Sequence, residues 1–247
     1  MHDTAFAFGR AFFEGYVTEP GARILDVGAQ DINGSLRGCA PASARYLGVD
    51  MAAGPGVDLV LDDPYSLPFG DGEFDAVVST SCFEHDPMFW LSFLEIVRVT
   101  RPGGHVYANT PSNGWVHCHP LDCWRFYPDS GLALQAWARR QGYDLTLVES
   151  FIGRRTGNVW NDAVMVFRRG PGGAACRRIS DLLPGAMNLR LAADEPVRNP
   201  QMASEDQQII QHLLKELSVR DETIAALRDG LAAMATLDTE AVAVPVD

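Results

Sequence analysis

Acidic residues accompany three successive segments that are predicted to be buried strands. Asp26 is in the first segment, which stops at Gly28, Asp50 ends the second, and Asp63 follows the third. In an open sheet of parallel strands, ligands bind beyond the carboxyl ends of the strands. Glycine at position 28 lets the backbone approach such a ligand closely. An acid placed like Asp50 can accept both hydroxyl groups of a ribose, and Asp63 can accept an adenine amino group, although a solvated surface aspartate would look the same.

The long stretch from Pro111 to Tyr127 combines histidine, aromatic and charged residues after another predicted strand. Long loops at the active end of such a sheet are commonly functional. A hydroxyl group that attacks an electrophile must lose its proton, so the site needs a base. His117 and Asp122 are the first candidates for this catalytic role, and His85, which titrates near neutral pH, is the third. His85 serves equally well as a structural residue before the helix that starts at Asp86–Pro87.

Aromatic and basic side chains in the same stretch suggest walls and an anchor for an acceptor molecule. Trp124 and Tyr127 are candidate walls, and Arg125 is a candidate partner for an anionic group of the acceptor. A structural interpretation fits the same residues. In it, Trp124 and Phe126 pin the loop to the core, and Arg125 pairs with Asp122. The sequence leaves both interpretations open.

Possible metal ligands also crowd into this stretch, namely His117, Cys118, His119, Asp122 and Cys123. Structural zinc sites usually combine one pair of ligands with a second pair farther along the chain. Here the ligands fall within seven residues and no distant pair accompanies them, so the geometry is unfavourable. A catalytic divalent ion held partly by Asp122 is no better supported. We therefore predict no metal site.

The elements that must position these residues alternate between short apolar runs and helical patterns from about residue 22 to 169. This alternation predicts parallel βαβ units in a doubly wound α/β sheet with helices on both faces. The predicted strands are 22–27, 45–50, 57–61, 74–79, 105–109, 145–149 and 159–168, the last two as an antiparallel pair. Helices are predicted at 88–99, where Arg101–Gly104 ends the helix, and at 130–141.

The composition changes after Arg169, which makes 1–169 the predicted first domain. Residues 170–203 have scattered prolines and weak periodicity and are predicted to be a linker or a loop draped over the core. Residues 204–236 are predicted to form a coiled-coil helix, and 237–247 a disordered tail. Seven of the eight heptad a and d positions are apolar, Arg220 being the exception. We favour a homodimer, or pairing with a partner protein, over an amphipathic helix folded onto the domain.

The bulk properties exclude several classes of protein. The formal charge of -12 opposes binding to phosphate backbones, and the arginine pairs are short, so we predict no nucleic-acid partner. The five cysteines are scattered without a CxxC pair, which suits reduced thiols. The N-terminus lacks the pattern of a signal peptide, and no stretch is apolar and long enough to span a bilayer. We therefore expect a soluble, cytoplasmic protein.

The ordered set of motifs across roughly residues 22–110 resembles the class I S-adenosylmethionine-dependent methyltransferases. The matching pieces are Ile24–Gln30, Asp50, Asp63–Asp75, Ser81–His85 and Arg101–Gly104. The resemblance implies a Rossmann-like, seven-stranded sheet with a terminal antiparallel hairpin, and S-adenosylmethionine as cofactor. It implies that Asp50 holds the ribose and Asp63 the adenine, while the Gly28 loop faces the methionine part. The cofactor-binding residues implied in this way are Asp26, Gly28, Ala29, Gln30, Asp50, Met51, Asp63, Ser81 and Cys82.

One departure from the family pattern concerns the loop after the first strand. The family has glycines at alternate positions, whereas Gln30 and Ile32 stand at two of them in this chain. Asn33–Gly34 follows and can supply the tight turn instead, because both residues tolerate left-handed backbone angles.

The function that the resemblance implies is transfer of a methyl group, by in-line displacement, to a hydroxyl or amine of a small molecule or glycan. The alternative is a catalytically inactive methyltransferase fold that docks a partner through its coiled coil. A nicotinamide-dependent oxidoreductase would need a GxGxxG loop and a catalytic tyrosine–lysine pair. Lys215 is the single lysine of the chain and lies in the predicted coiled coil, which excludes that class.

Overall fold

The computed structural model of the chain describes residues 3–157, 159–170, 177–191 and 195–241. The chain divides into two compact units, residues 1–200 and 201–247. The first unit holds every described strand, and the second consists mainly of one long helix.

The first unit is built on an eight-stranded sheet with the order β3-β2-β1-β4-β5-β7-β6-β8. The pairs from β3 to β5 are parallel, whereas β7 pairs antiparallel with both β5 and β6. The strand order reverses between β1 and β4, which is where open α/β sheets bind their ligands. The strands are β1 (Arg23–Val27), β2 (Arg45–Asp50), β3 (Leu59–Val60), β4 (Phe74–Thr80), β5 (Thr100–Pro111), β6 (Leu145–Gly153), β7 (Asp162–Arg169) and β8 (Ala186–Arg190).

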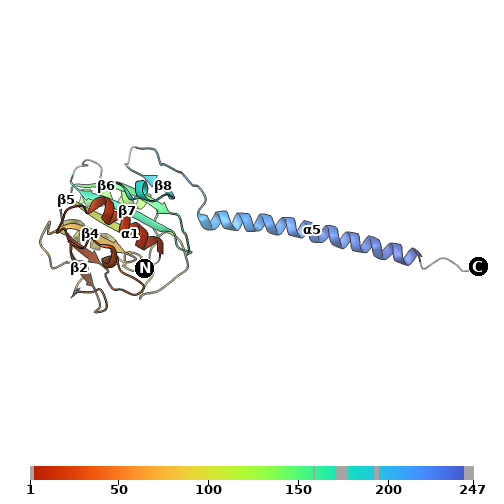
Figure 1. The fold of residues 1–247 in the computed structure, drawn as a ribbon, viewed down its shortest axis with the longest axis horizontal. Helices are drawn as coiled ribbons and strands as arrows, with labels where there is room; N and C mark the ends of the chain where they lie inside the picture. Colours follow the sequence, from red (N-terminus) through yellow and green to blue (C-terminus); the bar gives the residue numbers. More distant parts are fainter. Residues whose placement is uncertain (1–2, 158, 171–176, 192–194, 242–247) are drawn as a thin grey trace, which may run out of the picture. The chain divides into compact units, whose positions relative to one another are not determined.

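Helices cover both faces of this sheet and bury its apolar side chains. On one face lie α1, η1 and α4, and Phe12 of α1 packs on Tyr107 of β5 with ring centroids 4.9 Å apart. On the other face lie α2 and α3, and Phe93 of α2 packs on Phe167 of β7 at 5.1 Å. Figure 1 shows α1 drawn across the strands. The helices are α1 (Asp3–Tyr16), the 3-10 helix η1 (Leu36–Cys39), α2 (Phe89–Val99), α3 (Asp129–Arg140) and α4 (Ile179–Leu182).

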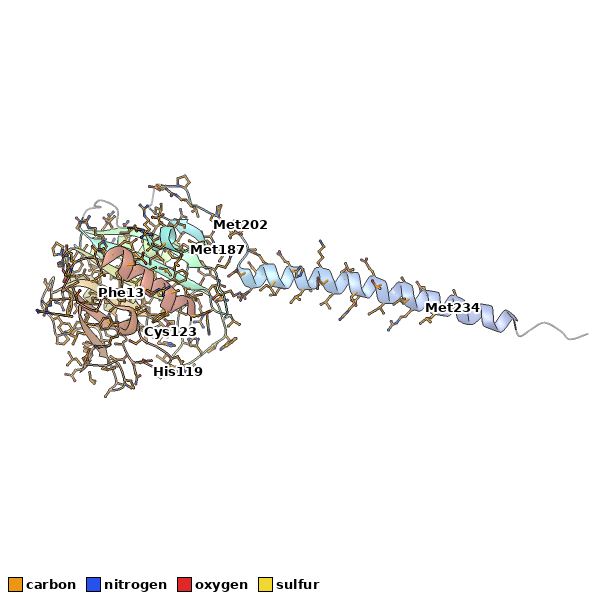
Figure 2. The ribbon with its side chains drawn as sticks, in the orientation of Figure 1. Phe13, His119, Cys123, Met187, Met202 and Met234 are labelled. Carbon is orange, nitrogen blue, oxygen red and sulfur yellow. The ribbon has the colours of Figure 1, made fainter. Side chains whose placement is uncertain are left out.

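The predicted doubly wound α/β sheet with a terminal antiparallel pair is confirmed, but the sheet has eight strands instead of seven. The additional strand β8 lies in the segment 170–203, which the sequence predicts to be a linker or loop, and it pairs antiparallel with β6. Met187 of β8, which Figure 2 labels, is 4% exposed and belongs to the core. Periodicity misses this strand because five residues carry little alternation and its pairing depends on a distant strand.

Other boundaries also differ from the prediction. Strand β3 is limited to Leu59–Val60, shorter than the predicted 57–61. Residues Arg101–Gly104, predicted as the turn that ends the helix 88–99, lie at the start of β5 next to an irregularity in its pairing with β4. The helix nevertheless ends at Val99, because Thr100 is already extended and a proline follows at 102.

The second unit contains α5 (Glu205–Ala241), shown as the long helix in Figure 1. Ser204 begins it with a capping box, because its hydroxyl accepts from the amide of Gln207 at 3.2 Å and the Gln207 side chain accepts from the Ser204 amide at 2.9 Å. The predicted tail 237–247 is helical as far as residue 241, and 242–247 lie outside the described residues. The coiled coil itself stays a prediction. None of the described helices is long and apolar enough to cross a membrane.

Candidate active site

The backbone turn at Gly28 joins the carboxyl ends of three strands. The amides of Gly28 and Ala29 both donate to the carbonyl oxygen of Val49 in β2, at 3.0 Å each. Gly28 has a φ of 84°, a backbone conformation that residues with side chains rarely adopt. A Cβ at this position would lie 2.7 Å from the Cβ of Cys82, which follows β4. Both the backbone angle and the packing therefore require glycine here.

Asp50, the last residue of β2, ties this turn to the loop after β2. Its Oδ2 accepts a hydrogen bond from the amide of Gln30 at 3.0 Å, and its Oδ1 accepts one from the amide of Met51 at 2.7 Å. Carboxylate oxygens offer further lone pairs, so hydroxyl donors can still bind. The side chain of Gln30 packs against Gly54, where an added Cβ would lie 2.5 Å from Nε2 of Gln30. The glutamine therefore turns toward the loop between β2 and β3.

The other two predicted acids of the cofactor site have different surroundings. Asp26 is 5% exposed and accepts a hydrogen bond from the hydroxyl of Tyr46 at 2.6 Å. Burial raises the pKa of Asp26 to about 6. Asp63 is exposed beyond the short β3 and accepts from the amide of Tyr65 at 2.8 Å. The structure therefore leaves Asp50 and Asp63 accessible at the strand ends and buries Asp26.

Ser81 and Cys82 follow the end of β4 beside the Gly28 turn. Ser81 has a φ of 52°, which is uncommon for a residue other than glycine. Its amide donates to the carbonyl oxygen of Asn109 at 2.9 Å and so joins the ends of β4 and β5. Such strained conformations cluster at functional sites, where the surrounding structure enforces them.

Exposed apolar side chains stand near these acids in the chain. Ile32 after β1 is 67% exposed, Met51 after β2 is 50% exposed, and Val60 in β3 is 45% exposed. Binding sites for nucleosides typically combine apolar surface with a few polar groups, since the base packs on apolar side chains and the sugar hydroxyls bind polar ones. The residues at the strand ends therefore fit a nucleoside-type cofactor.

The loop between β5 and α3, residues 112–128, is organised by Arg125. Its guanidinium pairs with both carboxylate oxygens of Asp122, at 2.5 and 2.8 Å, and donates to the carbonyl oxygens of Asn113, Trp115 and Trp124. These bonds favour the structural interpretation of Arg125 over the role of anion anchor, because they use its donors within the loop. The bonds from Arg125 also hold the pKa of Asp122 far below its usual value, which makes this carboxylate a weak base.

The aromatic residues of the loop divide into buried and exposed members. Phe126 is 2% exposed and packs on Phe89 of α2 with ring centroids 4.9 Å apart. Trp124 is 37% exposed, and its Nε1 donates to the carbonyl oxygen of Asp86 at 2.9 Å. Tyr127 is 62% exposed and leaves its ring accessible. Phe126 and Trp124 thus attach the loop to the domain. Figure 2 labels two other residues of this loop, His119 and Cys123.

The loop also brings His117 next to His85, with ring centroids 5.1 Å apart. Nδ1 of His85 lies 2.5 Å from the carbonyl oxygen of Leu121, and Nδ1 of His117 lies 3.2 Å from a carboxylate oxygen of Asp122. We assign a proton to Nδ1 of each ring, because Nδ1 faces these acceptors, which leaves Nε2 for other partners. Burial lowers the pKa of His85 and so favours its neutral form. Trp160, which no sequence motif marks, packs on His117 with ring centroids 4.8 Å apart.

Glu84 is a further member of this cluster, and its sequence position predicts no role for it. Its side chain is 1% exposed, and its Oε1 lies 3.7 Å from Nε2 of His85. Burial raises the pKa of Glu84 to about 8. Its backbone carbonyl accepts from the amides of Cys123 at 2.6 Å and Trp124 at 3.3 Å, which holds the loop against the end of β4. An acid next to a histidine after a buried strand is the sequence signal that points to this residue.

Residues 14–108 match the model of a family described as a methyltransferase domain. The chain is 38% identical over 112 residues to the phthiotriol/phenolphthiotriol dimycocerosates methyltransferase of Mycobacterium leprae, which covers 38% of this chain and 40% of that protein. It is 43% identical over 101 residues to an uncharacterized methyltransferase of a Mycobacterium species, which covers 35% of this chain and 38% of the relative. The chain thus spans about two fifths of the length of the curated relatives it matches.

Solved structures share the fold at low sequence identity. A Burkholderia thailandensis 1,6-didemethyltoxoflavin-N1-methyltransferase, solved with S-adenosylhomocysteine, has a TM-score of 0.55 and 19% identity, covering 68% of this chain and 79% of that chain. The [4+2]-cyclase SpnF has a TM-score of 0.51 and 16% identity, covering 68% of this chain and 81% of that chain. Since one neighbour is a methyltransferase and the other a cyclase, these likenesses define the fold, and the reaction has to be argued from the site residues.

Proposed function

We propose that the protein transfers a methyl group from S-adenosylmethionine to a hydroxyl or amine of a small molecule or glycan, because residues 14–108 match the model of a family described as a methyltransferase domain. The observation that carries the proposal is the placement of Asp50. Its carboxylate is half-buried at the end of β2 and bonded to the loop after β1, at the sheet edge where nucleosides bind.

The strand ends would hold the cofactor. Asp50 would accept the ribose hydroxyls, Asp63 would accept the adenine amino group, and Met51 would pack on the adenine ring. The Gly28 turn and Cys82 would face the methionine part, since they meet at the ends of β1 and β4. Further contacts are proposed for Ala29, Gln30 and Ser81, while Asp26 would support the turn from within the domain.

The acceptor must lie in line with the methyl group that S-adenosylmethionine supplies, and a hydroxyl acceptor must lose its proton. His117 and His85 are the proposed proton acceptors, because their rings lie together beside the end of β4, with centroids 5.1 Å apart. Asp122 would act as a positioning residue that orients His117 through its Nδ1, 3.2 Å away. The ion pair with Arg125 in turn fixes Asp122.

Exposed aromatic rings in the loop that carries His117 favour a ring-shaped acceptor such as a sugar. Trp115 and Tyr127 are each 62% exposed, and Trp124 is 37% exposed. Aromatic faces offer apolar contact area, while neighbouring polar groups bind hydroxyls. These residues are the proposed walls of the acceptor site.

The second unit is proposed to associate with a second copy of the chain. The heptad positions of α5 are exposed, among them Leu217 at 42%, Ile224 at 38% and Leu231 at 67%. Apolar side chains at the a and d positions become buried when two such helices pair as a coiled coil. Sedimentation of the full chain tests this proposal, since a dimer that dissociates on Ile224→Asp supports it and a monomeric parent chain contradicts it.

The proposed reaction can be tested with S-adenosylmethionine that carries an isotopically labelled methyl group. The full chain is incubated with a panel of sugars, glycans and small hydroxylated or aminated compounds, and mass spectrometry follows the label. Transfer of the label to an acceptor, absent in the Asp50→Ala variant, supports the proposal. A chain that binds the cofactor and transfers no label to any member of the panel contradicts the proposed acceptor class.

A further inference from the structure

Glu84, His85 and His117 converge although they come from the ends of two different strands. One carboxylate oxygen of Glu84 and one ring nitrogen of each histidine lie within 4.8 Å of one another. Oε2 of Glu84 is buried and has no hydrogen-bond partner among the described residues. A buried carboxylate without a partner is costly, and a bound cation would remove that cost.

The second ring nitrogen of each histidine is held as in many metal sites. Histidine ligands usually donate their other N–H group to a backbone carbonyl or a carboxylate, which orients the ring. His85 has the carbonyl oxygen of Leu121 at 2.5 Å from Nδ1, and His117 has the carboxylate of Asp122 at 3.2 Å from Nδ1. Both arrangements leave Nε2 as the coordinating atom.

We propose that Glu84, His85 and His117 bind a divalent transition-metal ion of the Zn²⁺ or Co²⁺ type. Two ligand atoms about 2.0–2.2 Å from a tetrahedral ion lie about 3.4 Å apart. Oε1 of Glu84 and Nε2 of His85 are 3.7 Å apart, so this pair needs only a small adjustment. Two imidazoles and one carboxylate leave a coordination position open, as in catalytic rather than structural metal sites.

This proposal departs from the prediction that the chain has no metal site. That prediction considers ligands within the single run 117–123, whereas the proposed set combines one loop histidine with two residues that follow β4. The exposed thiols of Cys118 and Cys123 are not part of the set. With an ion bound, the histidines act as ligands, and an acceptor hydroxyl at the open position would lose its proton more easily. This last consequence rests on the proposed function, whereas ion binding does not.

The test is titration of the full, tag-free chain with Co²⁺ after removal of metals by a chelator, followed by visible absorption and calorimetry. We expect a single ion per chain with the absorption bands of tetrahedral or five-coordinate Co²⁺. Glu84→Gln and His117→Gln should each weaken Co²⁺ binding at least tenfold, because even the loss of a group that only orients a ligand costs about tenfold or more. The matched control is His119→Gln, an exposed histidine of the same loop, which should bind as the parent chain does.

Three results would overturn the metal proposal. They are failure of the parent chain to bind Co²⁺, unchanged binding in both ligand variants, and a thiolate-to-cobalt charge-transfer band that assigns the ion to Cys118 or Cys123. Binding of S-adenosylhomocysteine, measured on the same preparations, shows that each variant is folded. If the parent chain binds S-adenosylhomocysteine and no Co²⁺, the metal site alone is rejected. If it binds Co²⁺ and no S-adenosylhomocysteine, the proposed function alone is rejected.

Discussion

The carboxylate of Asp50 and the backbone amide of Gln30 are joined by a 3.0 Å hydrogen bond that connects the ends of β2 and β1. Because the donor is the backbone, this bond does not depend on the side chain at position 30. The glutamine at this position therefore leaves Asp50 in place.

Gln30→Gly should accordingly change the affinity for S-adenosylhomocysteine by less than about threefold, within the range usual for surface substitutions. Calorimetry of the variant and the parent chain measures the difference. A gain of tenfold or more in the variant would mean that the glutamine side chain obstructs the cofactor.

Gly28→Ala should destabilise the first unit by about 2–4 kcal/mol, the sum of an unfavourable backbone angle and a clash. The added Cβ would lie 2.7 Å from the Cβ of Cys82. Gly142→Ala is the matched control, because Gly142 has a φ of 91° and an added Cβ would meet nothing within 4 Å. Urea unfolding should show a loss of about 1–2 kcal/mol in the control. Equal losses in the two variants would rule out the close packing of Gly28 on Cys82.

Asp26→Asn should make the free energy of unfolding less dependent on pH. The pKa of Asp26 is raised from 3.8 to about 6, so the folded state holds the proton more tightly than the unfolded state. The parent chain therefore loses stability as pH rises from about 4 to about 6, by about 3 kcal/mol in total, and the loss persists above that window. Asparagine keeps an acceptor for Tyr46 and avoids this loss.

Urea unfolding of both proteins at several pH values checks the Asp26 prediction. The stability of Asp26→Asn relative to the parent chain should increase across the window and then stay constant. Parallel curves for the two proteins would show that folding does not raise the pKa of Asp26, and would contradict the prediction.

His117→Ala should slow methyl transfer by about 10²–10⁴-fold while leaving S-adenosylhomocysteine affinity unchanged, since its proposed role is to accept the proton of the acceptor and not to bind the cofactor. Asp122→Asn should have a smaller effect of the same kind, because it only orients His117. His119→Ala controls for changes in the loop. Single-turnover rates measure methyl transfer and calorimetry measures cofactor affinity. Weaker cofactor binding in His117→Ala would show that this residue belongs to the cofactor site and contradict its proposed role.

The strand-end half of the candidate site was predictable because it depends on local sequence. Asp50 directly ends an apolar run, and Gly28 directly follows another, so reading strands also places these residues at one edge of the sheet. The same reasoning gives the doubly wound sheet and the antiparallel pair of β6 and β7.

The metal cluster and β8 were not predictable in this way, because both depend on contacts between distant segments. Glu84 meets His117 only because amides of the loop, at Cys123 and Trp124, bond to the carbonyl of Glu84. The pairing of Arg125 with Asp122 was one of two open interpretations, and the observed ion pair is consistent with it. Burial, which distinguishes Asp26 from Asp50, is likewise invisible in a row of strand-end acids.

The most direct test of the central claim is calorimetric titration of the full chain with S-adenosylhomocysteine, beside Asp50→Ala and the exposed neighbour variant Asp62→Ala. We predict micromolar binding by the parent chain and by Asp62→Ala, no binding of NAD, and affinity about 30- to 150-fold weaker in Asp50→Ala, as expected for loss of about 2–3 kcal/mol of charge-assisted hydrogen bonds. Failure of the parent chain to bind, or equal affinity in the parent and Asp50→Ala, would contradict the proposed cofactor site.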